Sequence, residues 1–494
     1  MVSMSPPEDA ENVEPTTAVT ATFDDDIDPG SIDTMSFSLA DGSGTIPSTV
    51  SYDATTRTAR LEPGQPLVLM RTYTATLSTA VHDTDGNSLA AAQRWDFTVR
   101  DGTWTAAEQI TVTSRAPGRV AVALGPEGSA VALWVDGTPR SLWSSAFVPT
   151  SGWGTPELVE TDEEGDVESI ATTCDLGGRT TVVWSQGDSG GGSNIWANQY
   201  SPSMGWSGAI RVDDAGSGGQ PQIDVDGSGN VVAVWEQAGV EIWASRYVTG
   251  SGWGPPGPVA TPGVSAVAPR VSVAEDGTSF VVWEQRPPGE IWSRSSNPTG
   301  VWSSPQRIGS GTVLVPDVAV DRGGAATSVW WADSAIWGSR YSRSVGWGTP
   351  EVLGEPVTGA PDTYSPQVVS DDVGNAIAMW GARDGTGAHV WANHYAEGMG
   401  WGTAEVLADE TFRPHIEMDG AGRALIVTTA REGGRQGLWG RRYLPAIGWL
   451  PLDLIQEHSQ IGATHVAMND SGQGVAVWAR QDGGVDSIWS SRFE

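Results

Sequence analysis

The stretch Asn230-Val-Val-Ala-Val-Trp-Glu-Gln-Ala-Gly-Val-Glu-Ile-Trp-Ala-Ser-Arg-Tyr-Val-Thr-Gly-Ser-Gly-Trp-Gly-Pro255 contains three landmarks that recur along the chain. An apolar run ends in Trp235, a segment of alternating polarity carries Trp243, and a Gly-Trp-Gly motif carries Trp253. The apolar run is typical of a strand covered on both faces, and the alternation is typical of a strand covered on one face. The stretch therefore predicts consecutive antiparallel strands joined by tight turns.

The same three landmarks repeat through the C-terminal four-fifths of the sequence, with successive Gly-Trp-Gly motifs or their relatives 45 to 54 residues apart. Four short strands in a repeat of this length are the anatomy of a β-propeller blade, because a blade buries both faces only by stacking on its neighbours. Eight repeats are marked by the tryptophan of the alternating segment, at Trp143, Trp196, Trp243, Trp292, Trp337, Trp391, Trp439 and Trp489.

The two ends of the repeat region complement each other. The eighth repeat stops at Glu494 before its third tryptophan, whereas Thr103-Trp104-Thr-Ala-Ala-Glu-Gln-Ile110 parallels Gly152-Trp-Gly-Thr-Pro-Glu-Leu158. A strand near Trp104 that pairs with the last blade would leave the ring without a free edge. We therefore expect an all-β fold in which residues 102–494 form an eight-bladed propeller closed by that pairing.

Residues 1–101 lie outside the repeat and are expected to form an immunoglobulin-like β-sandwich of about seven short strands. Thr20-Ala-Thr-Phe23, Asp83-Thr-Asp-Gly-Asn87 and Trp95-Asp-Phe-Thr98 stand in an order that resembles bacterial Ig-like domains of the S-layer (SbsA) type. That resemblance implies an exported, often cell-surface protein in which the domain is a spacer or adhesion element. The repeats resemble sialidase-like and Trp-rich lectin propellers, although the sialidase Asp-box is not reproduced: Ser272 to Phe280 is a distant echo of it.

Composition narrows the class of partner. The formal net charge is -33, with 60 acidic residues against 27 basic ones, so nucleic acid and anionic membrane surfaces are disfavoured. No apolar run approaches the length of a membrane span, and the single Cys174 allows no intramolecular disulfide. The N-terminus lacks the pattern of a signal peptide. We expect an extracellular or cell-surface monomer whose export signal is missing from this sequence.

Patterns for catalysis and metal binding are sparse. The sequence has no lysine and no Gly-x-Ser-x-Gly elbow, and the one histidine pair at ligand spacing, His389 and His394, would point to opposite faces of a strand. No catalytic residue, metal site or cofactor is predicted. Calcium at acidic turns stays open, with Asp224 and Asp226 showing the alternation that it favours, although hairpin turns need aspartate and glycine in any case.

Polar residues directly follow the tryptophan of the apolar strand, where loops of variable length would gather on one rim of a propeller. These candidate ligand-binding residues are Gln186, Glu236, Gln237, Glu284, Gln285, Asp333, Arg383 and Arg480. The leading hypothesis is a non-enzymatic binding or adhesion protein, in which an Ig-like stalk presents a propeller to a glycan or a protein. The alternatives are a sialidase-like glycoside hydrolase or lyase, which paired carboxylates at the channel would favour, and a purely structural surface component.

Overall fold

The computed structural model describes residues 3–42, 44–160, 165–214, 216–261, 263–354, 366–383, 387–409 and 412–494. Apart from one 3-10 turn at Pro29–Ser31, every regular element in those ranges is a strand. The chain divides into two compact units, which are described separately. The first contains Met1–Thr103, Asp470–Gln473 and Phe493–Glu494, and the second contains Trp104–Asn469 and Gly474–Arg492.

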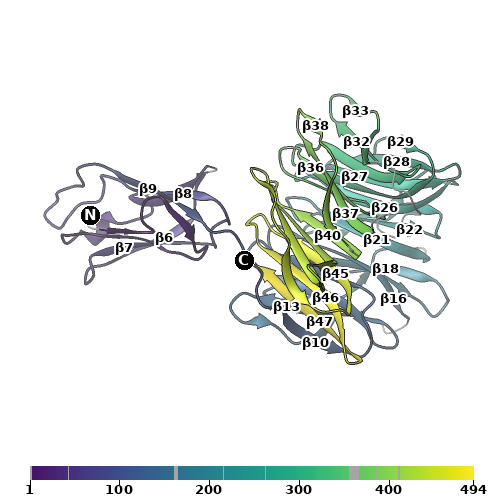
Figure 1. Cartoon of the computed structure of the whole chain (residues 1–494), viewed down its shortest axis with the longest axis horizontal. Coiled ribbons are helices and arrows are strands. Elements are labelled where there is room, and N and C mark those ends of the chain that lie inside the picture. The colour runs from purple at the N-terminus through teal and green to yellow at the C-terminus, as the bar shows by residue number, and fades with distance from the viewer. Residues whose placement is uncertain are drawn as a thin grey trace. The chain divides into compact units, whose positions relative to one another are not determined.

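Two sheets make up the N-terminal unit (Figure 1). The first has the strand order β1 (Ser3–Ser5), β3 (Val19–Thr22), β7 (Thr58–Pro63), β6 (Ser48–Asp53). The second has the order β2 (Ala10–Val13), β9 (Gln93–Val99), β8 (Thr72–Leu77), β4 (Phe37–Asp41), β5 (Gly44–Thr45), with β2 parallel to β9. Nine strands in two sheets, where about seven strands were expected, form the predicted β-sandwich.

Alternation along the strands builds the core of this unit. In β9, Trp95, Phe97 and Val99 are buried while the residues between them are more exposed. The rings of Tyr73 and Phe97 stack with centroids 5.9 Å apart, and Phe37 lies 6.1 Å from Trp95. Trp95, one of two tryptophans outside the repeat register, is therefore a core residue of the sandwich.

The second unit contains eight sheets among the described residues, each with consecutive strands paired antiparallel. The first strands of the sheets, in chain order, are β11 (Val120–Leu124), β16 (Val167–Cys174), β21 (Gly218–Val225), β26 (Ser265–Val273), β30 (Val313–Val320), β35 (Gln367–Ser370), β40 (Phe412–Met418) and β45 (Ile461–Met468). The second strands are β12 (Ala130–Asp136), β17 (Thr180–Gly187), β22 (Val231–Gln237), β27 (Ser279–Arg286), β31 (Ala326–Ala332), β36 (Ala376–Arg383), β41 (Ala424–Glu432) and β46 (Gly474–Asp482).

The third strands are β13 (Ser141–Val148), β18 (Ser193–Ser201), β23 (Glu241–Val248), β28 (Glu290–Ser296), β32 (Ala335–Ser342), β37 (Ala388–Ala396), β42 (Arg435–Leu444) and β47 (Val485–Phe493). The outer strands are β14 (Gly152–Trp153), β15 (Glu157–Leu158), β19 (Gly205–Trp206), β20 (Ile210–Arg211), β24 (Gly252–Trp253), β25 (Gly257–Pro258), β29 (Gln306–Ser310), β33 (Gly346–Trp347), β34 (Glu351–Gly354), β38 (Gly400–Trp401), β39 (Glu405–Asp409), β43 (Gly448–Trp449) and β44 (Asp453–Glu457).

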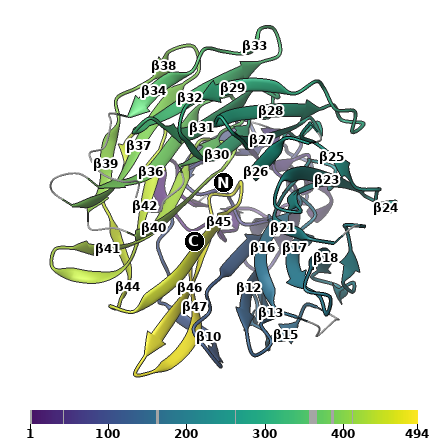
Figure 2. The same cartoon turned by 90° about the vertical axis from the view of Figure 1, so that its right-hand side faces the viewer.

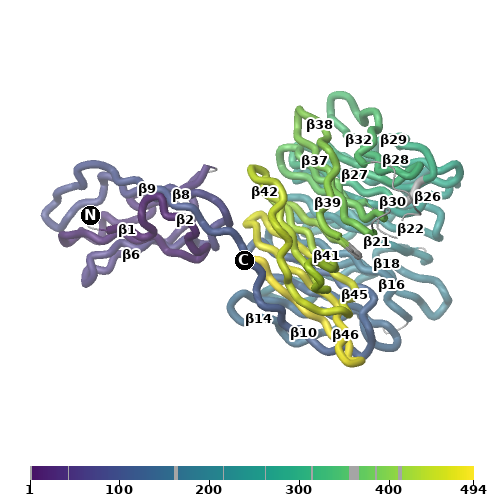
Figure 3. Tube along the Cα trace, in the orientation of Figure 1, coloured from purple at the N-terminus to yellow at the C-terminus, as the bar shows by residue number. Residues whose placement is uncertain are grey.

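Each first strand contacts the first strand of the next sheet, and β45 of the last sheet also contacts β11. Figure 2 shows the sheets arranged around a common centre, and the trace in Figure 3 passes through them in chain order. The outer strand of the last sheet comes from the beginning of the unit: β10 (Glu108–Thr113) pairs antiparallel with β47, Glu108 opposite Ser490. This sheet therefore contains strands from both ends of the repeat region.

In seven of the eight sheets a buried tryptophan of the second strand packs between neighbouring sheets, and β41 has Thr428 at that position. Trp184, Trp235, Trp283 and Trp478 are fully buried, and Trp283 packs against Val232 and Val234 of the preceding sheet. Because neighbouring sheets cover both faces, the second strands are buried along most of their length, polar residues included. The tryptophan of the Gly-Trp motif packs instead on an aromatic residue of the third strand, with ring centroids 5.1 to 5.8 Å apart in six repeats.

Candidate functional site

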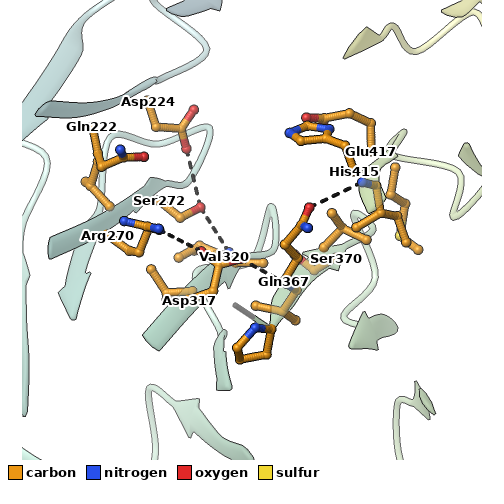
Figure 4. A pocket seen from close by; sticks show the side chains of 18 residues that line it. Gln222, Asp224, Arg270, Ser272, Asp317, Val320, Gln367, Ser370, His415 and Glu417 are labelled. Atoms are coloured by element: carbon orange, nitrogen blue, oxygen red, sulfur yellow. Dashed lines mark hydrogen bonds and ion pairs between the residues drawn. The ribbon is translucent and has the colours of Figure 1, made fainter. Parts of the chain in front are cut away.

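The first strands enclose a polar cavity, called here the inner cavity, of about 590 Å³. Five consecutive first strands line it: β21, β26, β30, β35 and β40. Figure 4 shows its polar side chains, which are Gln222, Asp224, Arg270, Ser272, Asp317, Gln367, Ser370, His415 and Glu417.

Strand alternation and β-bulges determine the direction in which these side chains point. Gln222 and Asp224 are two residues apart in β21, so both point to the face opposite Ile223. Before the cavity-lining residues the pairing register shifts in β21, β26, β30 and β40. Ala268 within one of these bulges has a φ of 54°. A bulge bends the strand and redirects the side chains that follow it, here toward the cavity.

Four of the polar side chains hold the backbone of the next first strand. Asp224 accepts from the Val273 backbone N–H at 2.7 Å, and Ser272 Oγ accepts from that of Val320 at 3.2 Å. Asp317 accepts from the N–H of Val368 at 2.9 Å, and Gln367 from that of Ile416 at 3.3 Å. These hydrogen bonds join consecutive sheets across the wall of the cavity.

Glu417 differs from these residues because its carboxyl has no hydrogen bond or ion pair within the described ranges. Burial, together with the charges of Asp224 and Asp317, raises the pKa of Glu417 to about 8. Burial also raises the pKa of Asp224 and of Asp317 to about 6, although backbone N–H groups and, at 3.9 Å from Asp317, Arg270 act in the opposite direction. Near pH 7 the cavity therefore holds one protonated carboxyl, which donates, and two carboxylates, which accept.

Two neighbouring imidazoles, tilted by 37° to each other, lie near the carboxyls. The rings of His415 and His465, from β40 and β45, lie with centroids 4.1 Å apart. Burial lowers the pKa of His465 to about 4 and that of His415 well below its usual value, so both rings are neutral near pH 7. Within the part of the chain that the structure describes, neither Nδ1 atom has a hydrogen-bond partner.

The acidic turns are held by hydrogen bonds of their own. Asp226 accepts from the N–H groups of Ser228 and Asn230 at 2.9 and 2.8 Å, as an aspartate in a tight turn does. Asp224, considered with it for calcium, faces the inner cavity instead, so the two carboxylates do not share one turn site. Among the described residues, no group of three or more His, Cys, Asp or Glu side chains is placed to hold a metal ion.

Among the eight residues predicted at the ends of second strands, Gln186, Gln237 and Glu236 are buried and accept hydrogen bonds from within the protein. Gln186 accepts from the indole N–H of Trp184 and Gln237 from that of Trp235, each at 2.9 Å. Glu236 accepts from the N–H of Ala268 at 2.7 Å and so holds the bulge that precedes Arg270.

The other five are distributed over four sheets. Glu284 is buried and pairs with Arg286 at 2.6 Å, while Gln285 beside it is half-buried. Arg480 pairs with Asp482 and lies 4.4 Å from the centroid of the Trp489 ring. Asp333 and Arg383 are exposed, and Asp333 lines a separate pocket. None of the eight lines the inner cavity, and their contact with a ligand stays a prediction.

A sequence pattern marks the positions of the cavity residues, although the residues at the ends of the second strands do not reveal it. When the repeats are aligned on the turn residues Asp226, Asp321 and Asp419, the cavity-lining side chains stand two or four residues earlier. Polar residues recur at those positions although hydrophobic ones flank them. In the structure the side chains at those positions in five first strands face one cavity.

Comparison with known proteins gives a family for the N-terminal unit. Residues 1–99 match the family described as Bacterial Ig-like domain, which confirms the predicted Ig-like domain. No curated protein matches the chain. The described residues include no helix long and apolar enough to span a membrane.

Solved structures with similar folds include lectins and a sialidase. The chain is 14% identical to a lectin of Aleuria aurantia described as a six-bladed β-propeller that recognises fucose, with a TM-score of 0.35, covering 61% of this chain and 99% of the lectin. For the NanB sialidase of Streptococcus pneumoniae the identity is 10% and the TM-score 0.37, covering 97% and 94%. For a protein of unknown function from Dyadobacter fermentans the identity is 12% and the TM-score 0.40, covering 78% of this chain and 99% of that protein. The strands of this structure make the described chain all-β, and the family match gives it an Ig-like domain at residues 1–99.

Proposed function

We propose that this protein binds carbohydrate in the inner cavity. The observation that carries the proposal is the mixture of donors and acceptors there. Asp224 and Asp317 offer carboxylate oxygens, while Arg270 and the protonated Glu417 offer hydrogens. A polyhydroxylated ligand matches such a lining because each hydroxyl both donates and accepts.

The charge of the cavity restricts the class of sugar. Its one lining arginine, Arg270, already faces Asp317 at 3.9 Å, and Asp224 and Glu417 add two further carboxyl groups to the lining. Recognition of a carboxylate or phosphate needs unpaired guanidinium groups. Neutral or amino sugars are therefore favoured over sialic acids and other anionic sugars.

The architecture that supports this site is also part of the proposal. The eight sheets are the blades of a closed propeller spanning residues 102–494, and β10 completes the last blade. The antiparallel pairing of β10 with β47 and the contact of β45 with β11 support closure. Residues 1–101 are an SbsA-type Ig-like domain that acts as a stalk for an exported, monomeric protein at the cell surface or outside the cell, and the family match at 1–99 supports this.

A second candidate function is hydrolysis of a glycosidic bond. The specific observation is that burial separates the carboxyl pKa values, about 8 for Glu417 and about 6 for Asp224 and Asp317. A carboxyl protonated at neutral pH can give its proton to the leaving-group oxygen, while an ionised carboxylate acts as base or nucleophile. Glu417 would be the acid, and Asp224 or Asp317 its partner.

A glycan array followed by a hydrolysis assay tests both functions. Wild-type protein should retain neutral or amino glycans, and Asp224→Asn should weaken retention about tenfold or more because a charged acceptor is lost. With aryl glycosides of the retained sugar, an enzyme would lose turnover in Glu417→Gln but still bind. Binding without turnover leaves the lectin-like function, and no retained glycan would leave the purely structural alternative.

A further inference from the structure

A second pocket, separate from the inner cavity, lies between outer strand β29 of one sheet and the next sheet along the chain. Its volume is about 430 Å³, within the usual range of small-molecule sites. The residues that decide its chemistry are Arg307, Gly309, Trp330, Asp333, Trp337 and Trp347.

The indole N–H of the second-strand tryptophan has a side-chain acceptor in three other repeats, whereas in a fourth Trp283 Nε1 is buried with no partner among the described residues. Trp184 donates to Gln186 and Trp235 to Gln237, both at 2.9 Å, and Trp478 donates to Gln456 at 3.0 Å. Trp330 is the equivalent residue in the sheet of this pocket. The position equivalent to Gln186 and Gln237 is Ala332, and the position equivalent to Gln456 is Gly309.

Trp330 therefore presents an unused donor to the pocket. Its side chain is only 1% exposed, and no hydrogen bond to its Nε1 exists within the described residues. Gly309 lets the indole lie directly against β29, since a Cβ at that position would be 2.6 Å from Trp330 Cζ2. Trp330 lines the pocket, so an acceptor on a ligand can pair with this N–H in place of water.

The rim of the pocket adds aromatic surface and polar groups. Trp337 and Trp347 are half-buried, and each ring is held in place. Trp337 Nε1 donates to the Ala332 carbonyl at 3.1 Å, and Trp347 packs on Tyr341 with centroids 5.7 Å apart. Asp333 and Arg307 are exposed at the edge. Rigid indole surface beside exposed polar groups suits the apolar face and the hydroxyls of a pyranose ring.

We propose that this pocket binds an N-acetylated hexosamine residue, with the acetamido carbonyl accepting from Trp330 Nε1. An amide carbonyl fits the floor better than a hydroxyl because it accepts without bringing a further hydrogen that would need a partner there. The acetamido methyl lies on the apolar lining, and the pyranose ring lies on Trp337 and Trp347 with its hydroxyls toward Asp333.

The variant Ala332→Gln tests the proposal, because it introduces the residue that stands at the equivalent position, as Gln186 and Gln237, in two other repeats. The new glutamine should accept from Trp330 Nε1, as Gln186 does from Trp184, and fill the floor of the pocket. Titration calorimetry of this variant with methyl N-acetyl-β-glucosaminide should show binding weakened about tenfold or more. In NMR spectra of wild-type protein, the same ligand should shift one indole N–H resonance. That resonance is assigned to Trp330 by its loss in Trp330→Phe.

Variants of exposed or half-buried tryptophans test the same pocket if Ala332→Gln does not fold. Trp347→Ala should weaken binding, whereas Trp253→Ala, at the equivalent position of another repeat, should not. Methyl glucoside, which lacks the amide, should bind wild-type protein far more weakly. Equal affinity for the two sugars, no binding by wild-type protein, or binding unaffected by both Ala332→Gln and Trp347→Ala would overturn the proposal. Glu417→Gln should leave the affinity of this pocket unchanged. A failure of the proposal for this pocket is therefore distinguishable from a failure of the proposal for the inner cavity.

Discussion

At the scale of single residues, polar side chains at the same position of the repeat have different partners. Asp224 and Glu417 both stand two residues before a turn aspartate, yet Asp224 accepts hydrogen bonds from the next first strand. Glu417 makes none within the described ranges, and burial keeps its carboxyl protonated near neutral pH. Asp224 therefore links two sheets and is also a candidate ligand-binding residue, whereas the Glu417 carboxyl is available to a ligand.

Glu417 should make stability depend on pH. Its pKa rises from an ordinary value of 4.5 to about 8 on folding, so the folded state holds a proton that the unfolded state releases. The contribution is complete below the unfolded pKa and is lost as the pH rises through the folded pKa. Urea unfolding should show wild-type protein losing about 1–3 kcal/mol more than Glu417→Gln between about pH 5 and pH 9. Parallel pH profiles for the two proteins would contradict the assignment.

Glu236 should act on the inner cavity without touching its ligand. Its carboxylate accepts from the Ala268 N–H in the bulge that leads to Arg270, so Glu236→Ala leaves that N–H without its acceptor. We expect a loss of about 1–3 kcal/mol in the free energy of unfolding, measured by urea titration, and weaker glycan binding. Glu236→Gln keeps an acceptor and should restore most of both. Equal losses in the two variants would show that the charge, not the hydrogen bond, matters.

The predicted ligand residues show where sequence reasoning reached its limit. Residues at the ends of second strands vary between repeats, which made Gln186, Glu236 and Gln237 look like a binding rim. Internal acceptors vary in the same way, because each buried indole N–H or bulge N–H needs a partner that can come from several positions. Only the structure distinguishes Gln186, which has an indole partner, from Ala332, where the partner is missing.

At the scale of strands, the apolar and alternating runs predicted the elements well because burial alone sets them. The second strands are covered on both faces by neighbouring sheets, and the strands of the N-terminal unit alternate between core and solvent. The bulges in the first strands were not predicted, since their positive φ values fall on Gln220 and Ala268, residue types that do not favour that conformation. Those bulges precede the cavity residues, which is why the cavity was missed.

The strand β10 should be essential to the last sheet. It covers β47 along the register from Glu108–Ser490 to Thr113–Asp486, and Arg492 pairs with Glu108 at 2.7 Å. A chain that starts at Trp104 keeps this strand, and a chain that starts at Ser114 exposes an unpaired edge. Thermal unfolding and light scattering should show the shorter chain less stable and more prone to aggregate. Two chains with the same unfolding temperature would argue against a closing role for β10.

At the scale of the whole repeat region, the tryptophan register predicts eight units, and the structure contains eight sheets among its described residues. The register says nothing of what the ring encloses. The inner cavity depends on which side chains five different first strands turn toward one another, a property of no single repeat. Its mixture of neutral acid, carboxylates and neutral imidazoles arises from burial, which only the assembled ring provides.

The most direct test of the central claim is a crystal structure of the protein soaked with the glycan that it retains best on an array. The account predicts a sugar residue in the inner cavity, within hydrogen-bonding distance of the carboxyls of Glu417 and Asp224. A structure in which that cavity holds only water while the glycan is bound elsewhere would contradict it.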